Sequence, residues 1–166
     1  MEIEQFAKLI EPLGPTERAD VINRFTHGFD KLIGIVFTRC ARESVEAYCD
    51  INNTHLQPYG LVHGGVYAAL SESTCSVGAA LMVLPKGQNA VGVANHTSFK
   101  NPARNGDRIY IKAVLKASQL GKIHHWETTI TGDKGQEYAC SVVKIAILEP
   151  NKKVGGEKIS LNNEIK

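Results

Sequence analysis

The segment from Gly64 to Leu84, GGVYAALSESTCSVGAALMVL, constrains the fold of this chain more than any other part of the sequence. Glu72 is its only charged residue, and its apolar and small residues fall on every side of an α-helix. A helix that is apolar on all sides is normally buried within a protein. Its most apolar run, Val77 to Leu84, is too short to cross a bilayer, and Pro85 ends it. The sequence therefore predicts a buried helix that begins near Gly64, and no membrane partner.

Extended segments are predicted on both sides of this helix. They are rich in β-branched and aromatic residues and are separated by turn residues, with two strands before the helix and four after it. The later strands follow one another through short turns, which requires antiparallel pairing. We therefore expect an α+β fold in which an antiparallel sheet wraps around one long central helix. The domain itself is predicted to span 31–149, between an N-terminal helical arm at 1–30 and a mobile tail at 150–166.

Composition excludes several classes of function. The net charge of +2 is too small to favour nucleic-acid binding. The first residues lack a basic stretch followed by an apolar run, so we expect a cytoplasmic protein. The four cysteines have no CxxC spacing and are expected to be buried free thiols. His124 and His125 are adjacent on a predicted strand and would point to opposite faces, so no metal site is predicted.

A carboxylate at Glu72 requires an explanation, because it costs several kcal/mol to bury unless it is paired or opens on a cavity. One interpretation is structural: Glu72 pairs with a basic side chain or caps a neighbouring element. The other is that Glu72 lines a partly dry pocket as a base or nucleophile. Gly64 and Gly65 open the same helix, where free N–H groups and the helix dipole favour a carbonyl oxygen that becomes an oxyanion. The two glycines alone also fit a simple helix-entry turn.

The spacing of these groups bears on assembly. Gly64 and Glu72 are eight residues apart, which places them about 12 Å apart along a helix axis. One helix cannot present both groups to a single carbon atom, but two antiparallel helices from two subunits can. A two-fold dimer would bring Gly64 of one chain near Glu72 of the other, and would do so twice.

The segment QPYGLVHGGVYAALSES, residues 57–73, resembles the signature of the hotdog-fold acyl-CoA thioesterases. The resemblance is to the phenylacetate-pathway type and to the glutamate-using 4-hydroxybenzoyl-CoA thioesterases, and it covers roughly Leu32 to Leu148. It implies hydrolysis of an aryl or medium-chain acyl-CoA to the free acid and coenzyme A. It also implies a homodimer or a dimer of dimers with the active site at the subunit interface, and no cofactor beyond the coenzyme A of the substrate.

The resemblance also implies roles for individual residues. The Gly64 N–H would polarise the thioester carbonyl, with Gln57 beside the thioester and His63 shaping the site. Glu72, from the partner subunit, would be the nucleophile or general base, and Ser76 would hold a water molecule beside it.

Contacts to the substrate are expected from further residues near the helix and the later turns: Gly65, Tyr59, Tyr67, Phe99, His96, Lys100 and Arg104. His96 stands where family members often carry Asn. The basic residues also fit solvated surface charge, so their binding to the phosphates of coenzyme A stays open. Two alternatives to a thioesterase remain at this point: a hydratase of the same fold, which needs a His and a carboxylate, and a non-catalytic acyl-CoA binding protein.

Overall fold

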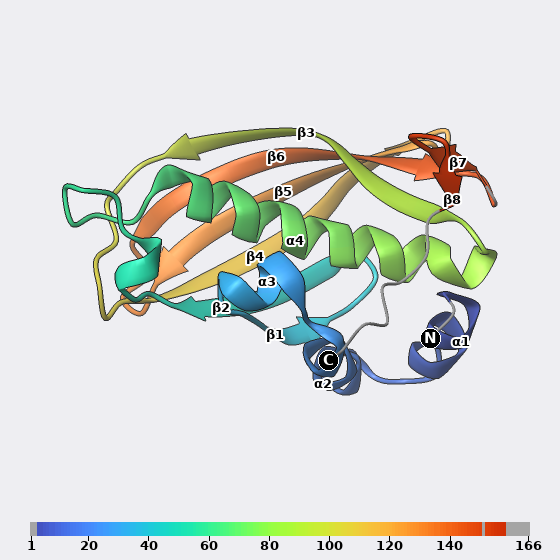
Figure 1. Cartoon of the computed structure of the whole chain (residues 1–166), viewed down its shortest axis with the longest axis horizontal. Coiled ribbons are helices and arrows are strands. Elements are labelled where there is room, and N and C mark those ends of the chain that lie inside the picture. Colours follow the sequence, from blue (N-terminus) through green and yellow to red (C-terminus); the bar gives the residue numbers. More distant parts are fainter. Residues whose placement is uncertain (1–2, 151, 159–166) are drawn as a thin grey trace.

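The computed structural model describes residues 3–150 and 152–158, and it consists mainly of one long helix lying across a six-stranded antiparallel sheet (Figure 1). The strand order in the sheet is β1-β2-β4-β5-β6-β3. The strands are β1 (Ile35–Cys40), β2 (Ser44–Asp50), β3 (Asn89–Phe99), β4 (Arg108–Gln119), β5 (Ile123–Gly132) and β6 (Glu137–Leu148). The prediction of two strands before the helix and four after it is confirmed.

The long helix, α4, runs from Gly64 to Val83 and is followed by the 3-10 helix η2 (Leu84–Lys86). One side of α4 packs against the sheet and contributes to the core. The residues that this side buries are Tyr67, Leu70, Ser71, Thr74, Cys75, Gly78, Ala79, Leu81 and Val83. The predicted start at Gly64 and stop before Pro85 are both confirmed, because the glycine pair and the proline are strong helix boundary signals.

Among the described residues, the opposite side of α4 is covered only in part, which corrects the expectation of a helix buried on all sides. Glu72 is exposed, and Ala69, Val77 and Ala80 are only half-buried. By length and composition α4 and η2 would also fit a membrane-crossing helix, but half of the most apolar window is buried inside the protein. A single sheet covers only one side of a helix, and for this reason the small and apolar side chains on the other side of α4 stay partly exposed.

Gly78 lies where α4 approaches β5 most closely. A Cβ atom at this position would lie 2.3 Å from the Trp126 ring, which is fully buried. Gly78→Ala is therefore expected to lower the free energy of unfolding by about 1–3 kcal/mol, as overpacked cores do, although alanine normally favours a helix. Urea denaturation of the native protein and the variant measures this difference.

The matched background for that variant is Trp126→Phe, because phenylalanine lacks the outer ring atoms that the new methyl group would meet. Gly78→Ala should cost less stability in this background than in the native protein. A Gly78→Ala variant as stable as the native protein would contradict the tight packing of α4 on β5.

The two edges of the sheet differ. At one edge, the Asn23 side chain of α2 (Pro15–Phe25) donates to the Phe37 carbonyl of β1 at 2.8 Å and accepts from the Phe37 N–H at 2.9 Å. At the other edge, no strand or helix among the described residues hydrogen-bonds to the outer side of β3. Val93 and Phe99 on β3 are largely exposed. The helical arm therefore closes one edge of the sheet, and the other edge is open.

The N-terminal arm also reaches the central helix. Besides α2 it contains α1 (Ile3–Ile10) and α3 (Gly28–Leu32), and α3 lies beside α4 (Figure 1). The Ser73 hydroxyl on α4 donates to Asp30 Oδ1 at 2.5 Å, and this hydrogen bond holds α3 against α4. At the other end of the chain, β7 (Lys153–Val154) pairs with β8 (Glu157–Lys158) in a short hairpin. Residues 159–166 of the predicted tail lie outside the described residues.

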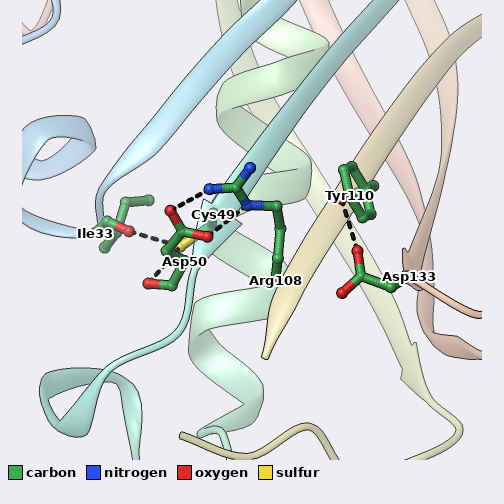
Figure 2. A network of polar contacts seen from close by, with 6 residues as sticks. All are labelled: Ile33, Cys49, Asp50, Arg108, Tyr110 and Asp133. Atoms are coloured by element: carbon green, nitrogen blue, oxygen red, sulfur yellow. Dashed lines mark hydrogen bonds and ion pairs between the residues drawn. The ribbon is translucent and has the colours of Figure 1, made fainter. Parts of the chain in front are cut away.

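Polar contacts fasten the arm and the strands at one end of the sheet (Figure 2). Arg108 on β4 donates to both carboxylate oxygens of Asp50 on β2, at 2.6 and 2.7 Å, and these hydrogen bonds lower the pKa of Asp50. The Cys49 thiol donates to the Ile33 carbonyl at 3.1 Å, directly after α3. Tyr110 on β4 donates to Asp133 at 2.7 Å. Arg108 is thus engaged in joining β2 to β4.

Candidate active site

Glu72 opens on a hollow of about 550 Å³ beside the uncovered side of α4. Ser76 lies one helical turn after Glu72 and lines the same hollow. The other lining residues are Phe29, Asp30, Ala69, Ser73, Val77, Ala80 and Ala90. The hollow therefore combines a carboxylate and hydroxyl groups with apolar walls, one of which belongs to the N-terminal arm.

The neighbouring thiol does not compete with Glu72 as a nucleophile. Cys75 is fully buried against the sheet, and burial raises the pKa of its thiol, with a smaller contribution from the negative charge of Glu72. The other buried thiols behave in the same way, because burial raises the pKa of Cys40 to about 12 and that of Cys49 to about 11. All four cysteines are free, and Cys140 is only half-buried. A protonated thiol is a poor nucleophile, so Glu72 is the candidate group on this helix.

The N-terminus of α4 presents a free backbone donor. His63 is the N-cap residue, and its Nδ1 accepts the Gly65 N–H at 2.9 Å, which holds the first turn in place. The Gly64 N–H has no acceptor among the described residues, as expected for the first N–H of a helix. The Phe99 ring packs so closely on Gly64 that a Cβ atom would lie 2.7 Å from it. Gly64 therefore offers an unpaired donor at the positive end of the helix dipole.

Gln57 lies in a tight loop just before this N-terminus. Its N–H donates to the Leu61 carbonyl at 2.8 Å, and its carbonyl accepts the Gly60 N–H at 2.9 Å. An isolated bridge between Leu56 and Val62 closes the loop. Tyr59 at its tip is 86% exposed, so within one chain it contacts neither hollow. The loop thus fixes the backbone of Gln57 seven residues before the start of α4.

A second hollow, of about 400 Å³, lies beside the start of α4. Its lining includes His63 and Gly65 from the predicted site. Phe29 of the arm lines both this hollow and the one at Glu72. Within one chain the Gly64 end of α4 and the Glu72 carboxylate therefore face different hollows, which are separated by Phe29.

The remaining predicted substrate contacts are placed differently. Tyr67 is buried, and its hydroxyl accepts the Ala103 N–H at 3.0 Å, so the structure places it in the core rather than in either hollow. Lys100 forms an ion pair with Glu137, at 2.8 Å between Nζ and Oε1. His96 and Arg104 are exposed and line neither hollow.

Sequence reasoning missed two contributions to this site. The arm residues Phe29 and Asp30 line the Glu72 hollow, and no motif in the sequence marks them. Gly92 on β3 lies against the Glu72 carboxylate, where a Cβ atom would be 2.7 Å from Oε1. A glycine inside a strand pattern indicates a bulge or a close approach of another group. Gly92, within the predicted strand AVGVANHTSF, shows this pattern in the sequence.

The architecture, a long helix across an antiparallel sheet of this strand order, is the hotdog fold of thioesterases. Residues 59–137 match the family described as the Thioesterase superfamily. The chain belongs to the thioesterase superfamily, and its class of reaction is thioester hydrolysis.

Individual relatives agree with this assignment. The chain is 32% identical to the proofreading thioesterase EntH of Cronobacter sakazakii over 117 residues, which are 70% of this chain and 82% of the relative. It is also 32% identical over 123 residues to Rv1847 of Mycobacterium tuberculosis, a protein named as an esterase, over 73% of this chain and 86% of the relative. The crystal structure of AziG from S. sahachiroi superposes with a TM-score of 0.71 at 27% identity, over 74% of this chain and 98% of AziG.

Proposed function

We propose that this chain hydrolyses an acyl-CoA thioester in a two-fold dimer whose active sites lie between the subunits. The observation that carries the proposal is that α4 bears an unpaired Gly64 N–H and an exposed Glu72 beside separate hollows. The two groups are about 12 Å apart along the helix axis. Two antiparallel copies of α4 would bring each Gly64 to the Glu72 of the other chain.

The uncovered surfaces of the single chain support such a dimer. The open edge of β3 carries unpaired backbone groups, which favour pairing with a second strand. The uncovered side of α4 carries half-buried Ala69, Val77 and Ala80, small residues that let another surface approach closely. A two-fold axis near β3 would cover both surfaces at once and create two equivalent sites.

In this dimer the thioester carbonyl would accept a hydrogen bond from the Gly64 N–H, with the Gln57 amide nearby. These donors stabilise the negative charge that develops on the oxygen when the carbonyl carbon is attacked. Glu72 of the partner subunit would either attack that carbon or remove a proton from a water molecule beside Ser76. In both routes the bond between carbon and sulfur breaks, coenzyme A leaves as the thiol, and one water molecule is consumed. In the general-base route the water oxygen enters the free acid, whereas in the direct route water hydrolyses the anhydride that Glu72 forms with the acyl group.

Two observations support an acyl-CoA as the substrate class. The smu.793 protein of Streptococcus mutans, a fold neighbour at a TM-score of 0.65 and 16% identity, was crystallised with acetyl-CoA, so this fold accommodates such a ligand. The hollow at Glu72 has apolar walls from Phe29, Val77 and alanines, which suit an aryl or medium-chain acyl group. Arg104 is exposed and Lys100 is paired with Glu137, so Arg104 is the freer of the two cations for the phosphates of coenzyme A.

The hydratase alternative has weaker support. Adding water across a double bond calls for a histidine as well as a carboxylate, and the described lining of the Glu72 hollow contains no histidine. A non-catalytic binding protein would not need an exposed carboxylate and an unpaired N–H on the same helix.

Release of free thiol from a panel of aryl-CoA and straight-chain acyl-CoA thioesters tests the proposal. We expect turnover, with the highest kcat/KM on the aryl or medium-chain acyl groups that the apolar walls of the Glu72 hollow suit. A folded dimer that binds these thioesters without releasing thiol would contradict the proposal and favour the binding protein. Hydration of an enoyl-CoA in the same assay series would favour the hydratase.

A further inference from the structure

Two residues of β3, Gly92 and Asn95, contact the part of α4 that carries Glu72. We propose that they are positioning residues, which fix the Glu72 carboxylate in one place on the otherwise uncovered side of the helix. This inference rests on the proposed role of Glu72 in thioester hydrolysis.

Asn95 holds the helical turn that leads to Glu72. Its Nδ2 donates to the Ala68 carbonyl at 2.9 Å. In an α-helix the carbonyl of residue 68 also accepts the N–H of residue 72. Asn95 therefore binds the same carbonyl oxygen that accepts the backbone N–H of Glu72. Thr97 donates to Asn95 Oδ1 at 2.8 Å, which fixes the orientation of the amide although Asn95 is exposed.

A chain of hydroxyl groups continues from Thr97 back into α4. The Thr97 and Ser141 hydroxyls lie 2.8 Å apart, and the Ser141 and Ser71 hydroxyls lie 2.9 Å apart. Thr128 on β5 also donates to Ser71 at 2.9 Å. Ser71, Thr128 and Ser141 are all buried, and a buried network in which each hydroxyl is bonded holds its members in one arrangement. Because Ser71 directly precedes Glu72, the network anchors α4 at a second point in the turn that leads to the carboxylate.

Gly92 provides the space that the carboxylate occupies. The register between β3 and β6 shifts between Gly92 and Ala94, so Val93 forms a bulge. A Cβ atom at Gly92 would lie 2.7 Å from Glu72 Oε1 and 3.4 Å from its Cδ. The backbone of Gly92 is not in the positive-φ region, so glycine is not required by the backbone at this position. Instead, the close approach of the Glu72 carboxylate is what favours a glycine at position 92.

The contacts of Gly92 and Asn95 restrict the positions that the exposed Glu72 side chain can adopt. A glutamate on an uncovered helix face is free to adopt several rotamers, and a misplacement of about 1 Å at a reacting group costs about 100-fold in rate. The β3 contacts fix both the backbone of the turn and the surface on which the carboxylate lies.

The test compares Gly92→Ala and Asn95→Ala with the native protein in the thiol-release assay. Each variant is expected to lower kcat about 10- to 100-fold, while KM changes by less than about threefold, because neither residue touches the substrate. The methyl group of Gly92→Ala meets the flexible end of Glu72 rather than backbone, so the fold is expected to persist. Melting temperature and elution volume check this. Thr129→Ala, at an exposed position of the central strand β5 outside the proposed interface, is the control and should retain native kcat.

A double-mutant cycle separates positioning from a merely structural effect. Gly92→Ala should have no further effect on the residual rate once Glu72→Gln is present, because no carboxylate is left to displace. An equal additional loss in that background would overturn the proposal.

The remaining outcomes are also distinguishable. If Glu72→Gln lowers the rate but Gly92→Ala and Asn95→Ala retain native kcat, the positioning inference is wrong and the proposed function stands. If Glu72→Gln itself retains native kcat, the proposed mechanism fails, and the positioning inference fails with it.

Discussion

Glu72→Gln is expected to lower kcat for acyl-CoA hydrolysis by at least about 100-fold, because an amide can neither attack the thioester nor accept a proton from water. The two side chains have nearly the same shape, so KM should change little. Glu72 is exposed in the single chain and bonded to no other side chain among the described residues. The change should therefore leave the melting temperature unaltered. Thiol release at saturating substrate measures the effect.

The control for this variant is Glu127→Gln, on the side of the sheet away from α4. Glu127 pairs with Lys116 at 3.3 Å in an exposed ion pair, and such pairs contribute less than about 1 kcal/mol. This variant should retain native kcat. Equal activity of Glu72→Gln and Glu127→Gln would remove Glu72 from the chemistry. A single turnover in ¹⁸O-water further separates the two routes, since only direct attack transfers label into the Glu72 carboxylate.

Gly64→Pro is expected to lower kcat by about 100- to 1,000-fold, which is the usual loss when one oxyanion donor is removed. Proline is well tolerated at the first position of a helix, where its missing N–H breaks no helical hydrogen bond. His63 already has a ψ of 133°, the extended conformation that a following proline requires. The variant thus removes the donor and preserves α4.

Gly64→Ala is the matched control, because it adds the same Cβ atom beside Phe99 but retains the N–H. A Cβ atom at this position lies 2.7 Å from the end of the Phe99 side chain, which is exposed and free to rotate. The alanine variant therefore accounts for the effect of the Cβ atom, and the further loss in the proline variant is attributed to replacing the N–H by the ring carbon Cδ. Equal rates for the two variants would show that the Gly64 N–H does not polarise the carbonyl.

Mixing the two inactive variants tests the shared active site. After dissociation and random reassociation of Gly64→Pro with Glu72→Gln, half of the dimers are mixed, and one site in each mixed dimer has both native groups. Activity should return to about a quarter of the native value. Recovery is impossible if Gly64 and Glu72 act within the same chain.

The boundaries of α4 and the succession of strands along the chain could be predicted from the sequence, because the structural preferences of glycine, proline and β-branched residues act locally. The orientation of α4 about its axis could not. Its apolar residues surround the helix, so no face is marked as the one that meets the sheet. For this reason Tyr67 was predicted to contact substrate and lies in the core. The helix was predicted to be buried on all sides, and the side that carries Glu72 is exposed.

The contribution of the N-terminal arm to the site also lay beyond sequence reasoning. Asp30 and Ser73 are 43 residues apart, and their contact depends on how α3 packs against α4. A local pattern shows that the arm is helical, but not which surface it covers.

The difference between the two sheet edges limits how copies of this chain can associate. A sheet with two open edges is able to add strands at both, which leads to ribbons and fibres. Here Asn23 occupies the backbone groups of Phe37 at the β1 edge. Among the described residues of the six-stranded sheet, β3 is then the one edge left to recruit another strand, so in the proposed dimer growth by edge pairing would stop after two copies. The N-terminal arm would then prevent open-ended polymerisation.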